Sequence, residues 1–263
     1  MTPKDPAPRL IINLTRDVKL ELAWIPPGEF LMGAYGEYPA EEPRHRVHIT
    51  SGFYLGVFPV TQAQFEVFTR AQKIDHKNGF PGKPNHPAEN MDWTEALGFC
   101  DWLNQNFAQE FSGFQATLPT EAQWEYACRA GTQTEYYTGD GEAALAEAGW
   151  YRGNSSYETQ EVGRKLHNIW GLHDMHGNVD EWCIDEWDEF AYAKRVDGVE
   201  DPVVWDGEWQ SRVRVVRGGG WNDSARYCRS SIRFRWSQDY RFRYLGFRAC
   251  LALGPLVRRA ESG

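Results

Sequence analysis

The sequence of 263 residues has no long apolar run. No stretch approaches the roughly 18 consecutive apolar residues that a helix needs to cross a bilayer. Its start, MTPKDPAPRL, lacks the apolar segment of a secretory signal peptide. These absences exclude a membrane-spanning helix and a signal peptide within the sequence. They predict a cytoplasmic protein without a membrane partner, in which residues 1–19 form an N-terminal tail.

Cysteine is scarce and shows no pairing pattern. The five cysteines are odd in number and widely spaced, and no two of them form a CxxC pair. This pattern excludes a disulfide framework and a cysteine-based zinc site. We therefore expect most of the thiols to be buried as small apolar groups. They are Cys100, Cys128, Cys183, Cys228 and Cys250.

The motifs of several common enzyme classes are missing. The sequence contains no Walker loop, no GxGxxG phosphate loop and no Ser/His/Asp nucleophile signature. Three glycines at 218–220 follow a predicted strand, but no helical pattern begins there. No catalytic residue is predicted from these motifs.

Positive charge is in deficit overall but concentrated in one segment. The net charge of −9 disfavours a general nucleic-acid binder. Residues 212–248, however, hold ten arginines against two aspartates, a balance of +8, and residues 185–208 hold nine acids against two bases, a balance of −7. Either these neighbouring segments pair with each other in the fold, or the arginines form an exposed basic patch for an acidic ligand.

Apolar and aromatic residues are plentiful, at 41% and 14% of the chain, which is enough for the core of one domain over residues 20–263. Capping motifs predict three helices, which begin after Thr61, Asp92 and Thr120. Apolar and β-branched runs predict strands at 20–25, 30–32, 46–49, 53–54, 213–217 and 246–251. Frequent glycine and proline indicate much irregular structure between these elements. The fold class is therefore α+β.

The last sixth of the chain interleaves arginines with aromatic and small polar residues. Alternation at period two predicts a strand or extended loop with arginines on one side and rings on the other. Rings gathered on a surface indicate binding, so we expect ligand-binding side chains in the region 220–245. They are Asn222, Asp223, Ser224, Tyr227, Ser230, Ile232, Phe234, Trp236, Ser237, Tyr240, Phe242 and Tyr244.

Ordered blocks along the chain resemble a known family. They are WIPPGEFLMG at 24–33, FYL at 53–55, PVT at 59–61, LPTEAQWEY at 118–126, GLHDMHGNVDEW at 171–182, RGG at 217–219 and LGFR at 245–248. In this order they resemble the signature blocks of the formylglycine-generating-enzyme (sulfatase-modifying factor) family, over about residues 20–251. The resemblance implies a C-type-lectin-like fold of the formylglycine-generating-enzyme subtype.

The enzymes of that family bind copper through two cysteines in the block after Gly-Gly. Matched onto this sequence, the second cysteine is Cys228, but Asp223 stands at the first. One thiolate does not supply the two soft ligands that favour Cu(I), and a carboxylate is a hard ligand. We therefore expect no copper and no enzymatic activity, and a copper-dependent oxidase acting on a peptide cysteine is the alternative.

The ending is most similar to the variable proteins of diversity-generating retroelements, which carry the same fold. In these proteins adenine-directed mutagenesis rewrites an exposed ligand-binding surface on a constant scaffold. Asn codons changed only at adenines can yield every predicted ligand-binding residue except Trp236, which an arginine codon could yield. The resemblance implies a non-enzymatic binding protein with an unknown ligand, expected to be a protein. Single-stranded nucleic acid also suits arginine and aromatic alternation, but the acidic balance of the chain disfavours it.

A calcium site is also implied by the resemblance. It would take the side chains of Asp174 and Glu181 and the backbone carbonyls of Gly177 and Val179. Carboxylate and carbonyl oxygens are the ligands that Ca²⁺ prefers. The alternative is a loop held by hydrogen bonds alone.

Overall fold

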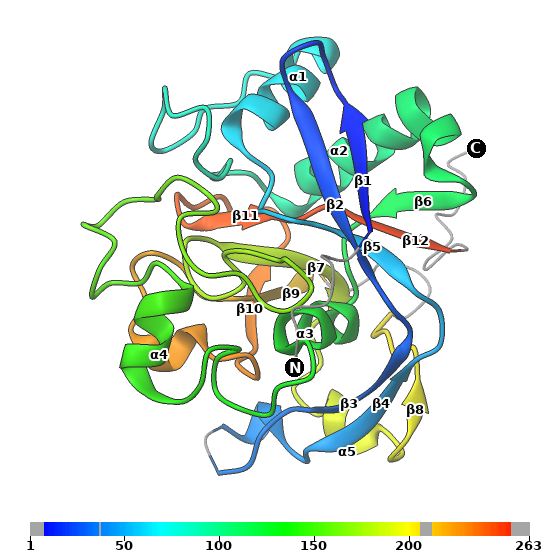
Figure 1. The fold of residues 1–263 in the computed structure, drawn as a ribbon, viewed down its shortest axis with the longest axis vertical. Helices are drawn as coiled ribbons and strands as arrows, with labels where there is room; N and C mark the ends of the chain where they lie inside the picture. Colours follow the sequence, from blue (N-terminus) through cyan, green and yellow to red (C-terminus); the bar gives the residue numbers. More distant parts are fainter. Residues whose placement is uncertain (1–7, 37, 206–211, 254–263) are drawn as a thin grey trace.

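The computed structural model describes residues 8–36, 38–205 and 212–253 (Figure 1). Parts of three predictions lie outside these ranges: residues 1–7 of the tail, 206–208 of the acidic segment, and 206–211 and 254–263 of the domain. The described residues mix helices with three β-sheets, which confirms the α+β class. Within these ranges no helix is long and apolar enough to cross a membrane.

The first sheet has five strands in the order β1-β2-β5-β12-β6. Its strands are β1 (Arg9–Asn13), β2 (Lys19–Ile25), β5 (Phe53–Gly56), β12 (Cys250–Leu253) and β6 (Phe114–Thr117), and every pair is antiparallel. The prediction of a tail over residues 1–19 is wrong for β1, which pairs with β2. Ile12 is fully buried in the core, so this five-residue strand is held by both hydrogen bonds and apolar contact.

Two smaller sheets complete the strand set. The second sheet has the order β10-β9-β7-β11, from β10 (Phe234–Ser237), β9 (Val213–Arg217), β7 (Asp180–Glu186) and β11 (Leu245–Phe247). The third has the order β3-β4-β8, from β3 (Gly28–Met32), β4 (His45–Ile49) and β8 (Val199–Glu200), at the bottom of Figure 1. The predicted strand over 246–251 is divided between β11 and β12.

The three predicted helices form as their capping motifs require. They are α1 (Gln62–Gln72), α2 (Trp93–Phe107) and α3 (Glu121–Arg129). Each begins with a complete capping box, in which the cap side chain and the side chain three residues later bond each other's backbone N–H. Two further helices, α4 (Gly141–Ala148) and α5 (Ala191–Lys194), lie between the predicted elements, where irregular structure was expected. Short 3-10 turns, η1 (Pro39–Glu41), η2 (Ala108–Phe111) and η3 (Ala225–Cys228), complete the set.

The region 220–245 is mostly irregular. Its one complete strand is β10, η3 precedes it, and β11 begins at Leu245. The predicted strand is therefore limited to β10, and most of the region is loop. Left-handed backbone at Gly218 and Gly219, with φ of 100° and 73°, turns the chain sharply after β9. A Cβ added to Gly219 would lie 2.5 Å from the carbonyl oxygen of Tyr227. Two glycines therefore allow the region to fold back closely over the end of its own sheet.

Candidate functional site

The buried arginines of the C-terminal part of the chain form ion pairs with distant glutamates. Arg217 of β9 donates to Glu121 over 2.9 Å and to Glu125 over 2.5 Å, both on α3. Arg233 also pairs with Glu121, over 2.6 Å. The remaining buried pairs are Arg229 with Glu41, Arg248 with Glu181 and Arg214 with Glu186.

These pairs show that neither pairing with the acidic segment nor an exposed basic patch describes the whole arginine-rich segment. Pairing with the acidic segment 185–208 is found for Arg214 and Glu186, while the other buried arginines reach glutamates elsewhere in the chain. Burial alone would raise the pKa of Glu121, but Arg233 and Arg217 lower it to about 2. The buried arginines are thus a charged framework that fixes the region 220–245 to the rest of the fold.

Three exposed arginines of the region also contact neighbouring elements. Arg241 donates to Asp92 over 2.5 Å and also pairs with Glu95, at the start of α2. The Arg243 guanidinium lies 5.3 Å from the centre of the Trp221 ring, and that of Arg235 lies 5.1 Å from the Trp187 ring. These three arginines therefore attach the region 220–245 to neighbouring elements and also place positive charge at the surface.

The rings between the anchors meet in one place. The aromatic cluster consists of Trp236, Tyr240, Phe242 and Tyr244. Phe242 stacks on Tyr244 with ring centres 5.0 Å apart and planes 7° apart, and Trp236 lies 5.3 Å from Phe242. Tyr240 is 46% exposed, while the other three rings are half-buried against the core. Tyr240 is thus exposed to solvent, and the other three rings of the cluster pack against the core beneath it.

Six other predicted ligand-binding residues are partly exposed. Asn222, Asp223, Ser224, Tyr227, Phe234 and Ser237 are all half-buried. The Tyr227 ring lies 5.4 Å from that of Phe234. Asp223 accepts a 2.8 Å hydrogen bond from the backbone N–H of Gly220, so it also shapes the turn that carries its neighbours.

The prediction is wrong for Ser230 and Ile232, which are 0% and 2% exposed. The Ser230 hydroxyl donates to the carbonyl of Glu135, and its own carbonyl accepts from Arg217. Ile232 packs inside the fold. Their place between framework arginines Arg229 and Arg233 turns both side chains inward, which an alternating pattern does not reveal.

An unpredicted acid, Asp180, lies beside the aromatic cluster at the start of β7. It is 3% exposed, and its Oδ1 has no hydrogen-bond partner. Burial and the neighbouring Asp223 raise the pKa of Asp180 well above its usual range. Burial, Asp180 and Asp223 in turn raise the pKa of Tyr244 to about 12. In the sequence, Asp180 is visible only as an acid inside the GNVDEW block. That block suggests the calcium loop and gives no sign that Asp180 lies beside the aromatic cluster.

The cysteine chemistry of the site is suppressed by burial. Cys228 is fully buried, and burial with the carboxylates of Asp223 and Asp180 raises the pKa of its thiol well above the usual range. Cys128 lies 3.6 Å from Nε2 of His176, which is the spacing of a nucleophilic pair. Burial raises the pKa of Cys128 to about 12 and lowers that of His176 to about 3. Both stay neutral at pH 7, so this pair lacks the thiolate that nucleophilic attack requires.

All five cysteines are free and buried, as predicted. Because none of the five cysteines is paired with another, the exclusion of a disulfide framework is confirmed.

Of the predicted calcium site, Asp174, Gly177 and Val179 lie in the loop before β7, and Glu181 lies within β7. Asp174 accepts a 2.8 Å hydrogen bond from the N–H of Gly163. Both oxygens of Glu181 accept from the Arg248 guanidinium, over 2.8 and 3.1 Å, and one also accepts from the Trp124 indole over 2.7 Å. A cation bound to Glu181 would lie beside this guanidinium. The arrangement therefore does not fit the implied calcium site.

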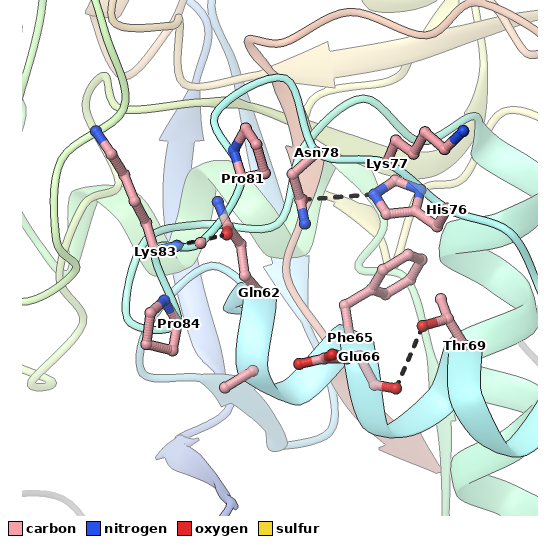
Figure 2. A pocket seen from close by; sticks show the side chains of 12 residues that line it. Gln62, Phe65, Glu66, Thr69, His76, Lys77, Asn78, Pro81, Lys83 and Pro84 are labelled. Carbon is pink, nitrogen blue, oxygen red and sulfur yellow. Dashed lines mark hydrogen bonds between the residues drawn. The ribbon is translucent and has the colours of Figure 1, made fainter.

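A separate hollow of about 590 Å³ lies between α1 and the loop that follows it (Figure 2). Gln62 donates to the Phe80 carbonyl and accepts from the backbone N–H of Lys83. His76 faces Asn78 over 3.4 Å. These bonds hold the loop against the helix, and the predicted ligand-binding residues lie elsewhere.

Comparisons with known proteins agree with this architecture. The chain is 28% identical to the formylglycine-generating enzyme of Streptomyces coelicolor, over 85% of this chain and 87% of that protein. It is 29% identical to the serine/threonine-protein kinase pkn1 of Chlamydia pneumoniae over 88% of this chain, but spans only 37% of that kinase. Two other chlamydial kinases are likewise covered over 35% of their length.

Solved structures are similar over nearly the whole chain. Treponema denticola variable protein 1 has a TM-score of 0.77 and 26% identity, over 92% of this chain and 98% of that one. PvdO from Pseudomonas aeruginosa has a TM-score of 0.79 and 25% identity, over 95% and 100%. The predicted C-type-lectin-like fold of the formylglycine-generating-enzyme subtype is confirmed. A family model described as a sulfatase-modifying factor enzyme 1-like domain matches residues 12–253, and the chain therefore belongs to this family.

Proposed function

We propose that the chain is a non-enzymatic binding protein of the cytoplasm, with a diversified surface at 220–245 that recognises a protein ligand. The observation that carries this proposal is the division of roles within the region. Buried arginines such as Arg217 and Arg233 tie it to α3, while Tyr240 and its neighbouring rings remain at the surface.

The chemistry of the surface supports binding. Tyrosine, tryptophan and phenylalanine offer large rigid contact areas at low entropic cost, and serine and asparagine offer adaptable hydrogen bonds. A central ring can contribute about 2 kcal/mol or more to an interface. The likeness to Treponema denticola variable protein 1 supports a diversified role for this surface.

The residues at the copper positions support a non-enzymatic role. Asp223 replaces one thiol, and burial raises the pKa of the remaining Cys228 thiol. Without two thiolates the site lacks the soft donor pair for Cu(I). The formylglycine-generating-enzyme relatives favour the runner-up, a copper-dependent oxidase acting on a peptide cysteine.

The deciding experiment is to sequence codons 220–245 from many independent cells of the source population, with the upstream codons as control. Under the proposal, substitutions cluster at adenine-derived positions that lie at the surface, such as Tyr240 and Phe242. Buried Ser230 and Ile232 stay constant. An invariant segment contradicts a diversified surface.

The runner-up has its own assay. Copper-dependent oxygen uptake with a cysteine peptide would establish the oxidase and overturn the non-enzymatic proposal. The matched variant is Asp223→Cys, which restores the second thiol. Uptake by this variant alone would identify residue 223 as the position that separates the binding protein from the enzymes.

A further inference from the structure

A cavity of about 500 Å³ opens beside the region 220–245. One wall comes from the region itself, at Ser224 and Arg226, and the other from the loop that follows α4, at Tyr151, Arg152 and Tyr157. In Figure 1 the orange segment that contains η3 lies against α4, and the two elements are in contact. The cavity thus joins the proposed diversified surface to the constant scaffold.

The two walls are fixed to each other by backbone contacts. The N–H of Arg152 donates to the carbonyl of Asp223 over 2.9 Å. The Ser155 hydroxyl donates to the carbonyl of Trp221 over 2.7 Å. These bonds place the scaffold loop before any ligand arrives, and such preorganisation lowers the entropic cost of binding.

Two arginines line the cavity. Arg152 and Arg226 are both exposed, and among the described residues neither forms an ion pair within 4.0 Å. The charge of Arg152 acts on Asp223, where it opposes the burial that raises the pKa of that carboxyl. The Arg226 guanidinium is held in place because it donates to the Tyr227 hydroxyl over 2.6 Å and lies 4.6 Å from the centre of that ring. This differs from Arg229 and Arg233, whose charges are neutralised inside the fold.

The rest of the lining limits what can bind. Tyr157, at 69% exposure, stands on the rim with left-handed backbone, φ 61°. An exposed ring held in an uncommon conformation favours a contact role. Glu142 lines the same cavity, and burial together with this carboxylate raises the pKa of Tyr151 to about 12. One acid in the wall and a net charge of −9 disfavour a polyanionic ligand. A ligand with a single carboxylate remains compatible with these charges, because two guanidinium groups line the cavity.

We propose that this cavity binds an acidic side chain of the protein ligand, with Arg152 and Arg226 as its partners and Tyr157 covering the aliphatic part of the bound segment. Guanidinium groups form strong, directional hydrogen bonds with carboxylates. The scaffold then supplies one constant charge, and the region 220–245 supplies a second charge beside its rings. This inference rests on the proposed binding function and adds the chemistry of the ligand.

The test selects a library of random twelve-residue peptides displayed on phage against the purified full chain. We expect the bound peptides to be enriched in aspartate and glutamate. The double variant Arg152→Ala, Arg226→Ala should bind a selected peptide about tenfold or more weakly, because both partners of the carboxylate are lost. The charge-reversed variant Arg152→Glu, Arg226→Glu should instead enrich lysine and arginine.

The matched control is Arg70→Ala, Arg164→Ala, which removes two exposed arginines that pair with Glu66 and Glu161 away from the cavity. It should bind the selected peptide as the unmodified chain does. Peptides that lose binding in Tyr240→Ala but show no acidic enrichment and no response to the cavity variants would overturn this inference and leave the binding function standing. A library from which nothing is enriched would count against both.

Discussion

Arg217 on β9 and Glu125 on α3 form a 2.5 Å ion pair in which both side chains are fully buried. The pair joins a helix in the middle of the sequence to the strand that precedes the region 220–245. Since Arg217 also reaches Glu121, and Glu121 also binds Arg233, each of these charges depends on the others. Removing Glu121 leaves Arg233 buried without a carboxylate partner, and removing Arg217 leaves one arginine for each glutamate.

The first prediction concerns this network. Glu121→Gln should lower the free energy of unfolding by about 3–5 kcal/mol, because the buried Arg233 loses its carboxylate and the buried Arg217 keeps only Glu125. Urea unfolding at pH 7 measures the change. Glu66→Gln is the control, since Glu66 pairs with Arg70 at the exposed surface of α1 and its loss should cost less than about 1 kcal/mol. Equal costs for the two variants would contradict a central role for the network.

The acid dependence of stability follows from the same carboxylate. Arg233 and Arg217 lower the pKa of Glu121 from 4.5 to about 2 against the effect of burial. The contribution of Glu121 to stability is therefore present above pH 4.5 and is lost as the pH falls towards 2. Between these values the free energy of unfolding of the unmodified chain should fall towards that of Glu121→Gln, and the two curves should meet near the lower end. Parallel curves would show that the ion pairs do not govern acid stability.

The second prediction concerns Asp180, whose pKa is raised well above its usual range by burial and by Asp223. A raised carboxyl pKa favours folding at low pH, and this contribution is lost as the pH rises through the folded-state pKa. Asp180→Asn keeps the shape and cannot ionise, so its melting temperature should exceed that of the unmodified chain increasingly as the pH rises. The exposed Asp17→Asn is the control. A constant difference across pH would contradict ionisation as the cause.

The third prediction separates surface rings from supporting rings in the aromatic cluster. Tyr240→Ala should change the free energy of unfolding by no more than about 0.5 kcal/mol, because the ring is 46% exposed. Phe242→Ala should cost about 1–3 kcal/mol, because that ring is half-buried against the core and stacked on Tyr244. Urea titrations of the two variants make the comparison. A greater loss in Tyr240→Ala would mean that its ring serves packing rather than contact.

The fourth prediction concerns calcium. Because Arg248 and Trp124 already donate to both oxygens of Glu181, we expect no rise in melting temperature when calcium is added to protein treated with a chelator. A rise of several degrees would restore the calcium site that the family resemblance implies. Asp174→Asn then distinguishes a specific site, where the rise disappears, from weak surface binding, where it persists.

Local signals in the sequence predict the three capped helices and the fold family, but not α4 and α5. Thr61, Asp92 and Thr120 cap their helices as predicted, because a capping box is made of residues three positions apart. β7 was missed, because its sequence DEWCIDE places four acids in a strand that is buried throughout. Those acids are tolerated because distant groups bond them, as when the N–H of Glu121 donates to Asp185 over 2.7 Å. A local sequence pattern cannot predict hydrogen-bond partners that lie so far away in the chain.

The candidate site was predicted in outline only. Tyr240 and its neighbouring rings lie together at the surface as expected, since aromatic residues with few apolar neighbours in sequence seldom all find room in a core. The burial of Ser230 and Ile232 and the acid beside Trp236 depend on where the chain turns after Gly219. That turn is set by three-dimensional packing over the end of the sheet, which alternation in sequence does not encode.

The reach of Arg229 and Arg233 has a consequence for synthesis of the protein. Arg229 pairs with Glu41, 188 positions earlier in the chain, and Arg233 pairs with Glu121, 112 positions earlier. During synthesis Glu41 and Glu121 emerge from the ribosome before Arg229 and Arg233, so at first they have no arginine partner. The sheet that contains β7 also lacks β9 and β11 at that stage. A product that terminates early, or whose reading frame is lost before Arg217, would keep these acids without partners. Such a product cannot complete its core, so the region 220–245 takes its observed place only in a chain that extends through β12.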